Sequence, residues 1–239
     1  MSSSDSSQAA PTILIVGAGR GLGHAMAEEF LKRGWSVIGT VRPGASRTKL
    51  HDLAETANGR AEIDTLDINE PAQIAALRNR LAGRTLDILF INAGITTIDE
   101  HIKIGDVTTE EFTSVMTTNA LSPMRVIESL QDLVPATGII GAMSSGQGSI
   151  SNNETGMREV YRGSKAALNM FMRSFAARQP EPSRTMLLMA PGWVRTDLGG
   201  PDAPFSIQES IPSLVNVMLS QKGTPGLQFL DRFGRTVPW

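Results

Sequence analysis

The chain has 239 residues, 41% of them hydrophobic, with 22 Lys and Arg against 24 Asp and Glu and no cysteine. The length suits one large domain or two small ones, and the absence of cysteine excludes disulfides, thiolate metal sites and a cysteine nucleophile. The net charge of −2 gives no bulk attraction to nucleic acid, and no apolar run approaches the roughly 20 residues that a membrane-spanning helix needs.

The serine-rich N-terminal segment, residues 1–10, has neither the basic start nor the apolar stretch of a signal peptide. We therefore expect this segment to be disordered and the protein to be cytoplasmic, which also fits the lack of disulfides. The three histidines, His24, His51 and His101, show no metal-ligand spacing, so no metal site is expected.

From Pro11 onward, continuous apolar runs of about five residues recur along the chain, as is typical of strands buried on both faces of a sheet. In chain order they predict strands at Ile13–Val16, Ser36–Val41, Ala61–Leu66, Asp87–Ile91, Thr137–Met143, Arg184–Met189 and Leu227–Leu230.

Longer segments with apolar residues at helical spacing separate these strands. They predict helices at Leu22–Arg33, Ser46–Ala57, Pro71–Leu81, Thr109–Leu133, Tyr161–Ala177 and Ile207–Ser220. Alternating strands and helices indicate a central, mostly parallel seven-stranded sheet flanked by helices. No repeat or linker divides the chain, so we expect residues 11–239 to form one doubly wound α/β domain.

A glycine-rich turn joins the first predicted strand to the first predicted helix. By itself, a glycine-rich string is as often an ordinary turn as a nucleotide-binding one. Here its position favours the dinucleotide-binding turn of a Rossmann fold, in which glycines admit a pyrophosphate close to the backbone and the helix N-terminus binds it. The expected cofactor-binding residues of the turn are Gly17, Gly19, Arg20, Gly21, Leu22 and Gly23.

The end of the second predicted strand bears on the choice between NAD and NADP. NAD-binding proteins usually have an acidic residue there, which holds the ribose 2′-hydroxyl. This chain has Arg42 instead, and Arg20 lies in the glycine turn. Two guanidiniums that converge on a 2′-phosphate favour NADP(H). The alternative is that both are ordinary solvated arginines.

Tyr161 and Lys165 form a second motif, four residues apart on one face of a predicted helix. A phenol has a pKa of about 10, which a nearby cation lowers by roughly 1–3 units. Tyr161 is the only tyrosine in the chain. The pair therefore indicates a proton donor tuned by an ammonium group, although such a pair in isolation is common.

Two serines, Ser144 and Ser145, follow the fifth predicted strand, at the edge where open α/β sheets bind ligands. A hydroxyl at this place can donate a hydrogen bond to a substrate carbonyl. Either serine can equally be a capping or loop residue.

Together these motifs make the chain resemble the short-chain dehydrogenase/reductase family over residues 11–239. Within the family, Tyr161–Met170, Pro191–Pro204 and the C-terminal end from Phe229 are similar to the C-factor and sniffer-type carbonyl reductase branch. The motifs that carry the family resemblance are Gly17-x-x-x-Gly21-x-Gly23, Asn92-Ala93-Gly94, Asn119, Ser145 with Tyr161 and Lys165, and Pro191-Gly192-Trp193-Val194-Arg195-Thr196.

The resemblance implies an NADPH-dependent carbonyl reductase that acts on a small molecule as a homodimer or homotetramer. Tyr161 would protonate the carbonyl oxygen, Ser145 would orient it, and Lys165 would hold the nicotinamide ribose. Asn119 would hold a water that links Lys165 to solvent. Alternatives are an NAD-linked alcohol dehydrogenase and a non-catalytic NADP(H) sensor. The remaining implied cofactor contacts are Asp67, Asn92, Ala93, Gly94, Pro191, Gly192, Val194 and Thr196.

Three departures from the family pattern stand out. Val16 replaces a threonine that ties the glycine turn, and Ile91 replaces an asparagine on the adenine side. The interval from Ser145 to Tyr161 is longer than usual, so residues 147–158 are expected to form a loop over the site. Because of this longer interval, Ser144 or Ser149 could take the role of Ser145 in orienting the carbonyl.

Pro123 lies four residues after Asn119, inside a predicted helix. Because proline has no N–H, the Asn119 carbonyl loses its helical partner and the helix is expected to bend. We expect the freed carbonyl to take a water as its donor, and Pro123 thereby to help create the site that the resemblance assigns to Asn119.

Overall fold

Seven strands form one sheet in the computed structural model, which describes residues 10–180 and 184–239. The N-terminal segment expected to be disordered lies, apart from Ala10, outside the described residues. The strands are β1 Thr12–Val16, β2 Ser36–Val41, β3 Ala61–Thr65, β4 Ile88–Ile91, β5 Ile139–Met143, β6 Thr185–Ala190 and β7 Gly226–Asp231.

The strand order is β3-β2-β1-β4-β5-β6-β7, and every neighbouring pair is parallel. β1 pairs with β2 on one side and with β4 on the other, so the strand order reverses at β1. In open α/β sheets ligands bind beyond the carboxyl ends of the strands at such a reversal. A ligand-binding site is therefore expected at the loops after β1 and β4.

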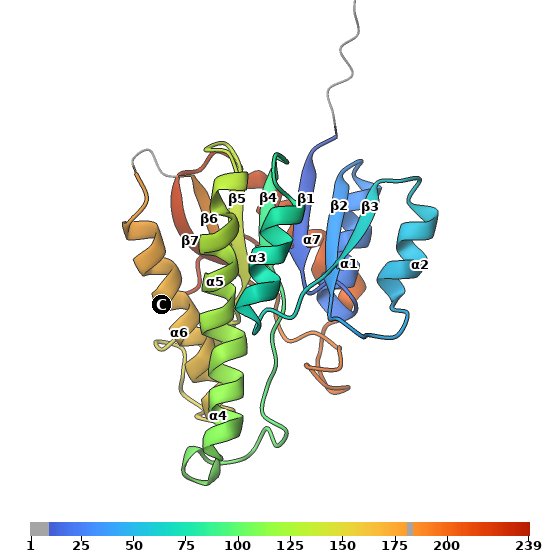
Figure 1. Cartoon of the computed structure of the whole chain (residues 1–239). Coiled ribbons are helices and arrows are strands. Elements are labelled where there is room, and N and C mark those ends of the chain that lie inside the picture. The colour runs from blue at the N-terminus through green and yellow to red at the C-terminus, as the bar shows by residue number, and fades with distance from the viewer. Residues whose placement is uncertain (1–9, 181–183) are drawn as a thin grey trace, which may run out of the picture.

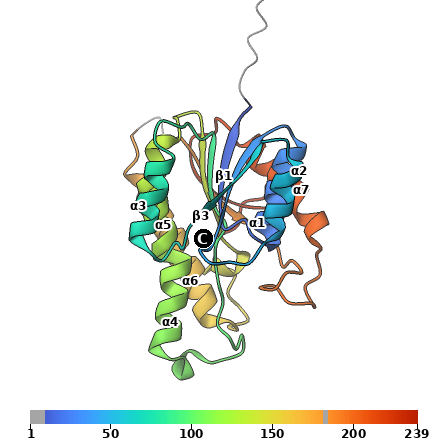
Figure 2. The same ribbon diagram turned by 45° about the vertical axis from the view of Figure 1, so that its right-hand side comes forward.

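Helices cover both faces of the sheet. Figures 1 and 2 show α3, α5 and α6 on one face, with α4 extending past the sheet, and α1, α2 and α7 on the other. The helices are α1 Gly21–Lys32, α2 Lys49–Thr56, α3 Pro71–Arg80, α4 Thr109–Met116, α5 Ser122–Leu130, α6 Glu159–Ala177 and α7 Ile207–Ser220.

Two buried clusters hold these layers together. Along β1, Leu14 and Val16 belong to the cluster under α3, α5 and α6, whereas Ile13 and Ile15 belong to the cluster under α1 and α7. Side chains alternate between the faces of a strand, so a continuously apolar strand supplies both clusters. All four of these side chains are fully buried. The doubly wound α/β fold expected from the sequence is confirmed, with a sheet that is parallel throughout.

The long helix predicted at Thr109–Leu133 is interrupted. α4 ends at Met116, a π-helical turn occupies Thr117–Leu121, and α5 begins at Ser122. A short 3₁₀ turn, Gln131–Leu133, follows α5. Pro123 cannot donate to the Asn119 carbonyl, and π-helical turns occur where the regular hydrogen-bond ladder of an α-helix fails. The expected irregularity is therefore present next to Asn119.

Other boundaries differ by one to three residues. α2 begins at Lys49 rather than Ser46, because Thr48 and His51 form a capping box that starts the helix there. β5 begins at Ile139 rather than Thr137, because the Gly138 N–H donates to Pro135 in a turn. Among the described residues no helix is long and apolar enough to cross a membrane, and none of the His, Asp and Glu side chains cluster as a metal site.

Candidate active site

The glycine turn after β1 is packed too closely for side chains. Gly17 has a φ of +88°, and a Cβ there would lie 2.9 Å from Ala93. A Cβ on Gly23 would lie 2.1 Å from the carbonyl oxygen of Gly17. Glycine is required at both positions, since the first α1 turn packs directly on the strand end. These glycines therefore fix the shape of the turn, and the N-terminus of α1 follows it directly.

Thr40 supplies the hydroxyl that the sequence lacks at position 16. Its Oγ1, on β2, accepts the Gly17 N–H at 3.0 Å. On the other side, the Asn92 amide donates to the Gly17 carbonyl at 2.8 Å. The turn is thus tied to β2 and to the loop after β4. Sequence reasoning missed Thr40, because its partner lies 23 positions away.

The N-terminus of α1 is free to bind an anion. Arg20 precedes the helix without a side-chain cap, and the first turn of α1, all of it described, contains no acidic residue. The first N–H groups of a helix lack partners within the helix and lie at the positive end of its dipole. The turn and the helix N-terminus together fit a phosphate group.

Arg20 pairs with an acidic side chain that the sequence analysis did not place at the site. Its Nη1 lies 2.6 Å from Oδ2 of Asp197, in the loop after β6. A carboxylate at hydrogen-bonding distance holds a guanidinium more strongly than solvent does. Arg42 lines a hollow at the end of β2, together with Pro43, Gly44, Ala45, Asp67, Glu70 and Gln73.

Asp67 is fixed in this hollow after β3. Its Oδ1 accepts the Asn69 N–H at 2.9 Å, and its own N–H donates to Gln73 at 2.8 Å. The hollow thus brings together Arg42 and Asp67, both expected as cofactor contacts. Gln73 is a further lining residue that the sequence did not indicate.

Tyr161 and Lys165 lie in the first half of α6 and are both buried, with 7% and 4% of their surfaces exposed. The Lys165 Nζ donates to the Met143 carbonyl at 2.9 Å and lies 5.8 Å from the centre of the Tyr161 ring. Burial lowers the pKa of Lys165 from 10.5 to about 8. Helical spacing therefore places the pair together as expected.

The pKa of the Tyr161 phenol is shifted by other groups than the sequence indicated. Burial raises the pKa of Tyr161, and the charge that opposes this rise is that of Arg158, whose guanidinium lies 4.7 Å from the ring centre. A side-chain hydrogen bond with Ser145 also lowers the pKa, whereas Glu100 raises it. Lys165 points its amine to Met143 instead, so the expected lowering by Lys165 is not seen. Arg158 was absent from the residues expected at the site.

The three serines after β5 have different partners. Ser144 donates its hydroxyl to Asn169 at 2.6 Å and is buried. Ser149 is also buried, and its hydroxyl accepts the Asn152 N–H. Of the three, Ser145 lowers the pKa of the Tyr161 phenol through its hydroxyl. Its hydroxyl also accepts the Gln147 N–H at 3.1 Å, in the short 3₁₀ turn Gly146–Gly148.

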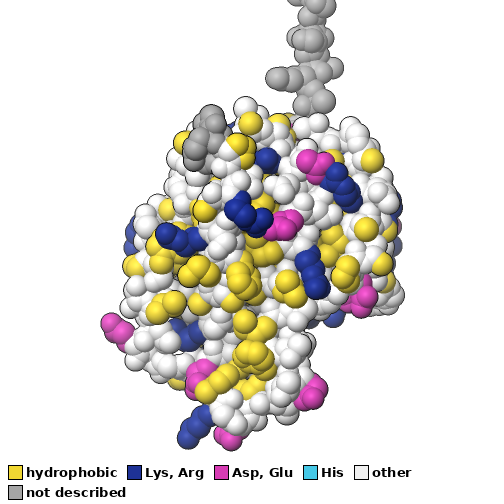
Figure 3. All heavy atoms as spheres, turned by 60° about the vertical axis from the view of Figure 1, so that its left-hand side comes forward, with side chains coloured by type: hydrophobic (Ala, Val, Ile, Leu, Met, Phe, Trp, Pro, Cys, Tyr) yellow, Lys and Arg dark blue, Asp and Glu magenta, His cyan; other side chains and the backbone are white. Residues whose placement is uncertain are grey.

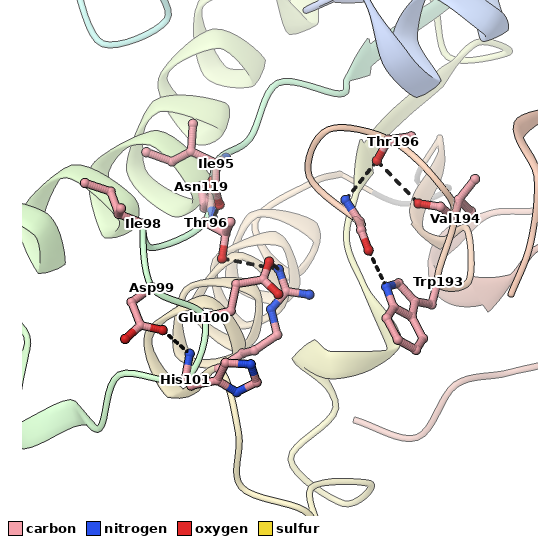
Figure 4. Close-up of polar contacts among 12 residues, drawn as sticks. Ile95, Thr96, Ile98, Asp99, Glu100, His101, Asn119, Trp193, Val194 and Thr196 are labelled. Carbon is pink, nitrogen blue, oxygen red and sulfur yellow. Dashed lines mark hydrogen bonds and ion pairs between the residues drawn. The ribbon is translucent and has the colours of Figure 1, made fainter. Parts of the chain in front are cut away.

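Asn119 lies fully buried in the π-helical turn. Its amide accepts the Ile95 N–H, donates to the Ile95 carbonyl and donates to Ser164, at 2.8, 2.8 and 2.9 Å. Figure 4 shows Asn119 beside Ile95 at the start of the loop after β4. All these bonds use the side chain, which locks that loop to α6. A Cβ on Gly94 would lie 3.3 Å from Asn119 Oδ1 and 3.4 Å from Lys165 Nζ, so the three residues adjoin.

The segment Pro191–Thr196 follows β6 at the same edge of the sheet. Gly192 has a φ of +88°, and Val194 forms an isolated bridge with Phe205. The Trp193 indole N–H donates to the Gly199 carbonyl at 2.6 Å, while Trp193 remains 52% exposed. Figure 4 shows Trp193, Val194 and Thr196 opposite the loop that carries Asp99, Glu100 and His101. The loop after β4 adjoins Tyr161 through Arg158, which pairs with Glu100 and lies 4.7 Å from the ring centre.

The longer interval before Tyr161 forms a loop, as expected. After the turn at Gly146–Gly148, the loop is tied by Ser151, whose hydroxyl donates to the main-chain oxygen of Trp239 at 2.7 Å. It ends at Arg158, against the Tyr161 ring. The loop therefore contributes Arg158 directly to the site.

The comparison with family models matches residues 11–204 to the model described as short chain dehydrogenase. Among solved structures, a protein of Burkholderia multivorans, crystallised with bound NADP, is 63% identical, with a TM-score of 0.95 over 96% of this chain and 100% of that chain.

Two other similar proteins belong to the branch expected from the sequence. The carbonyl reductase Sniffer of D. melanogaster is 27% identical, with a TM-score of 0.85 over 96% of this chain and 100% of that chain. The C-signal protein of Myxococcus xanthus is 33% identical over 64% of this chain and 93% of its own length.

Proposed function

The chain belongs to the short-chain dehydrogenase family, and from this premise we propose that it is an NADPH-dependent oxidoreductase that reduces a carbonyl to an alcohol. One observation carries the proposal: Tyr161 and Lys165 are buried together on α6, with the Lys165 Nζ 5.8 Å from the centre of the Tyr161 ring, at the sheet edge that also holds the glycine turn. A phenol, a hydroxyl and an amine at one ligand-binding edge fit proton transfer to a carbonyl oxygen.

The residues present fit a dinucleotide. Gly17 and Gly23 let the turn pack tightly, a Cβ on Gly21 would have no neighbour closer than 3.9 Å, and the free N-terminus of α1 adjoins the turn. Arg42 and Asp67 share the hollow at the end of β2 and β3. An arginine at this place supports a 2′-phosphate and therefore NADP(H). The bound NADP of the Burkholderia multivorans protein supports the same cofactor.

The proposed reaction adds a hydride to the carbonyl carbon and a proton to the carbonyl oxygen. Bound NADPH supplies the hydride. Tyr161 donates the proton from its phenol, and the Ser145 hydroxyl orients the carbonyl by a hydrogen bond. A general acid within hydrogen-bond reach of the oxygen typically contributes about 10²–10⁴-fold to such a rate.

Lys165 and Asn119 support Tyr161 in this proposal. The Lys165 amine, with a pKa of about 8, exchanges protons near neutral pH and would hold the ribose of the cofactor. The Asn119 side chain ties the Ile95 loop to α6. Its main-chain carbonyl, deprived of an α-helical partner by Pro123, would hold the water that connects Lys165 to solvent.

The substrate class is a small aldehyde, ketone or quinone. Exposed apolar side chains on the loops around Tyr161 support a substrate with apolar surface. These side chains are Ile98, Met157 and Trp193, which are 98%, 53% and 52% exposed. The carbonyl reductase activity named for Sniffer supports the same class.

The test is the loss of NADPH absorbance across a panel of aldehydes, ketones and quinones. We expect turnover with at least one class, and its loss in Tyr161→Phe with NADPH binding retained. The matched control is Phe171→Tyr, an exposed position on α6 away from the site. Equal turnover in Tyr161→Phe and in the unaltered protein would contradict the proposal.

We also propose that the protein is a homodimer or homotetramer through α4–α6. Large apolar side chains remain exposed there: Phe112 and Leu121 at 42%, Met170 at 59% and Phe171 at 42%. Figure 3 shows hydrophobic side chains gathered along the middle of the face to which α6 belongs. Such patches mark association surfaces. Light scattering on Phe171→Glu and on the unaltered protein would test this, and a monomer in both would contradict it.

A further inference from the structure

Arg158 has an unusual backbone conformation for its residue type. Its φ of 61° and ψ of 43° lie in the left-handed region. In the part of the chain that the structure describes, Asn58 is the other non-glycine residue with positive φ. Asparagine adopts this conformation readily, whereas arginine does so at a cost. Such strain persists where the surrounding structure holds it, and it concentrates at functional sites.

The Arg158 side chain is buried although it is charged. Only 11% of it is exposed, and its guanidinium carbon lies 4.7 Å from the centre of the Tyr161 ring. Its Nε, which is also buried, has no hydrogen-bond partner among the described residues. A buried charge is stable only when other groups compensate it. Part of that compensation comes from the Tyr161 ring, since a cation is attracted to an aromatic face.

Two groups on the loop after β4 hold the guanidinium in place. Arg158 Nη2 lies 2.8 Å from Glu100 Oε1 and donates to Thr96 Oγ1 at 3.2 Å. The loop itself is fixed to α4, because the Ile98 N–H donates to Glu111 at 2.7 Å. The cation is therefore positioned from two sides, by its own strained backbone and by a separate loop.

We propose that Arg158 is a positioning residue that stabilises the ionised form of the Tyr161 phenol and so makes its proton easier to transfer. This inference rests on the proposed role of Tyr161 as proton donor. It assigns to Arg158 the electrostatic part that the sequence pattern assigns to Lys165. Glu100 then acts in opposition, since it holds Arg158 but also faces the phenol with a negative charge.

The charged groups that face the phenol come from three segments. Arg158 precedes α6, Lys165 lies on α6, and Glu100 lies on the loop after β4. Burial raises the pKa of Tyr161, Arg158 lowers it and Glu100 raises it. Lys165 has a pKa of about 8 and loses its charge before a phenol ionises. The Arg158 guanidinium also lies closer to the centre of the Tyr161 ring than the Lys165 amine does, at 4.7 Å against 5.8 Å.

Tyr161 is the only tyrosine of the chain, which allows its ionisation to be measured directly. Protein labelled with ¹³Cζ-tyrosine gives one tyrosine resonance, whose shift is followed with pH in the folded protein. We expect Arg158→Gly to raise the midpoint by roughly one pH unit, a tenfold change in proton affinity. Glycine relieves the left-handed strain at this position, so the variant is expected to fold.

Three further variants sharpen the test. Arg158→Lys keeps the positive charge, so the Tyr161 midpoint is expected to stay close to that of the unaltered protein. Glu100→Gln removes the opposing charge and is expected to lower the midpoint. Arg173→Met is the charge-matched control, because it lies on α6 about 18 Å along the axis from Tyr161, and its midpoint is expected to equal that of the unaltered protein.

An Arg158→Gly midpoint equal to that of the unaltered protein would overturn the proposal, as would an equal shift in Arg173→Met. The readout needs no substrate, so it is independent of the proposed reductase activity. Should the midpoints move as expected while Tyr161→Phe keeps full turnover, the reductase mechanism fails and the effect of Arg158 on the phenol stands. Should the midpoints stay fixed while Tyr161→Phe is inactive, the reductase mechanism stands and the proposed effect of Arg158 on the phenol fails.

Discussion

Arg20 and Asp197 form an ion pair that joins the glycine turn after β1 to the loop after β6, with Nη1 and Oδ2 2.6 Å apart. Both side chains are 73% exposed, so the pair adds little to the stability of the fold. Its importance lies in its position. We expect a phosphate bound at the glycine turn to compete with Asp197 for the same guanidinium, because arginine binds both anions through the same donors.

Asp197→Asn is therefore expected to tighten NADPH binding. Release of Arg20 removes the competing carboxylate, and the strength of exposed ion pairs limits the gain to roughly twofold to fivefold in Kd. Fluorescence titration with NADPH measures it. The gain is expected to shrink at high salt, which screens the pair. Identical Kd values in the variant and the unaltered protein at low salt would contradict this competition.

Arg42→Ala is expected to weaken NADPH binding roughly tenfold and to leave NADH binding unchanged, since only NADPH carries the phosphate that Arg42 would hold. Steady-state KM values for both cofactors check this. Arg47→Ala is the matched control, because Arg47 lies nearby but pairs with Asp52 and Glu55. An equal loss for NADH and NADPH would mean that Arg42 does not read the 2′-phosphate.

Pro123→Ala restores an N–H that can donate to the Asn119 carbonyl and favours a regular helix in place of the π-helical turn. We expect proton transfer to slow, seen as a lower kcat with a larger solvent isotope effect. Pro212→Ala provides the control, because Pro212 also lies inside a helix but on α7. Unchanged turnover and isotope effect in Pro123→Ala would refute the role of the freed carbonyl.

Lys165 makes stability depend on pH. Its folded-state pKa of about 8 lies below the ordinary value of 10.5, so between these values the unfolded chain binds more protons than the folded one. Stability therefore rises with pH in this window, by at most roughly 1.4 kcal/mol per unit. Urea unfolding between pH about 8 and 10 checks the slope. Lys165→Met is expected to lack this rise, and an equal slope in both proteins would contradict the burial of a charged amine.

The regular parts of the fold were predictable because their signals are local. Ile207–Ser220 has the predicted bounds of α7, since Ser206 and Glu209 form a capping box before an apolar periodic segment. β2 likewise has its predicted bounds, from a continuous apolar run. The break in the helix predicted at Thr109–Leu133 was harder to place, because Pro123 indicates an irregularity but not the π-helical turn that absorbs it.

The site was predictable where its residues lie close in sequence, and less so where distant segments meet. Tyr161 and Lys165 are four residues apart on one helix, so their proximity follows from helical geometry. Arg20 and Asp197 are 177 residues apart, and no local pattern predicts their contact. Arg158 lies three residues before Tyr161, but its placement over the ring depends on a left-handed backbone and on Glu100.

The central claim is that hydride from NADPH and a proton from Tyr161 reduce a carbonyl. The most direct test supplies NADPH deuterated at the transferring position of C4 and follows the label by mass spectrometry with a carbonyl from the panel. We expect deuterium on the former carbonyl carbon, and labelled product formed at least about 100-fold more slowly by Tyr161→Phe. Equal rates of labelled product in both proteins, or NADPH binding with no labelled product from any carbonyl of the panel, would contradict the claim.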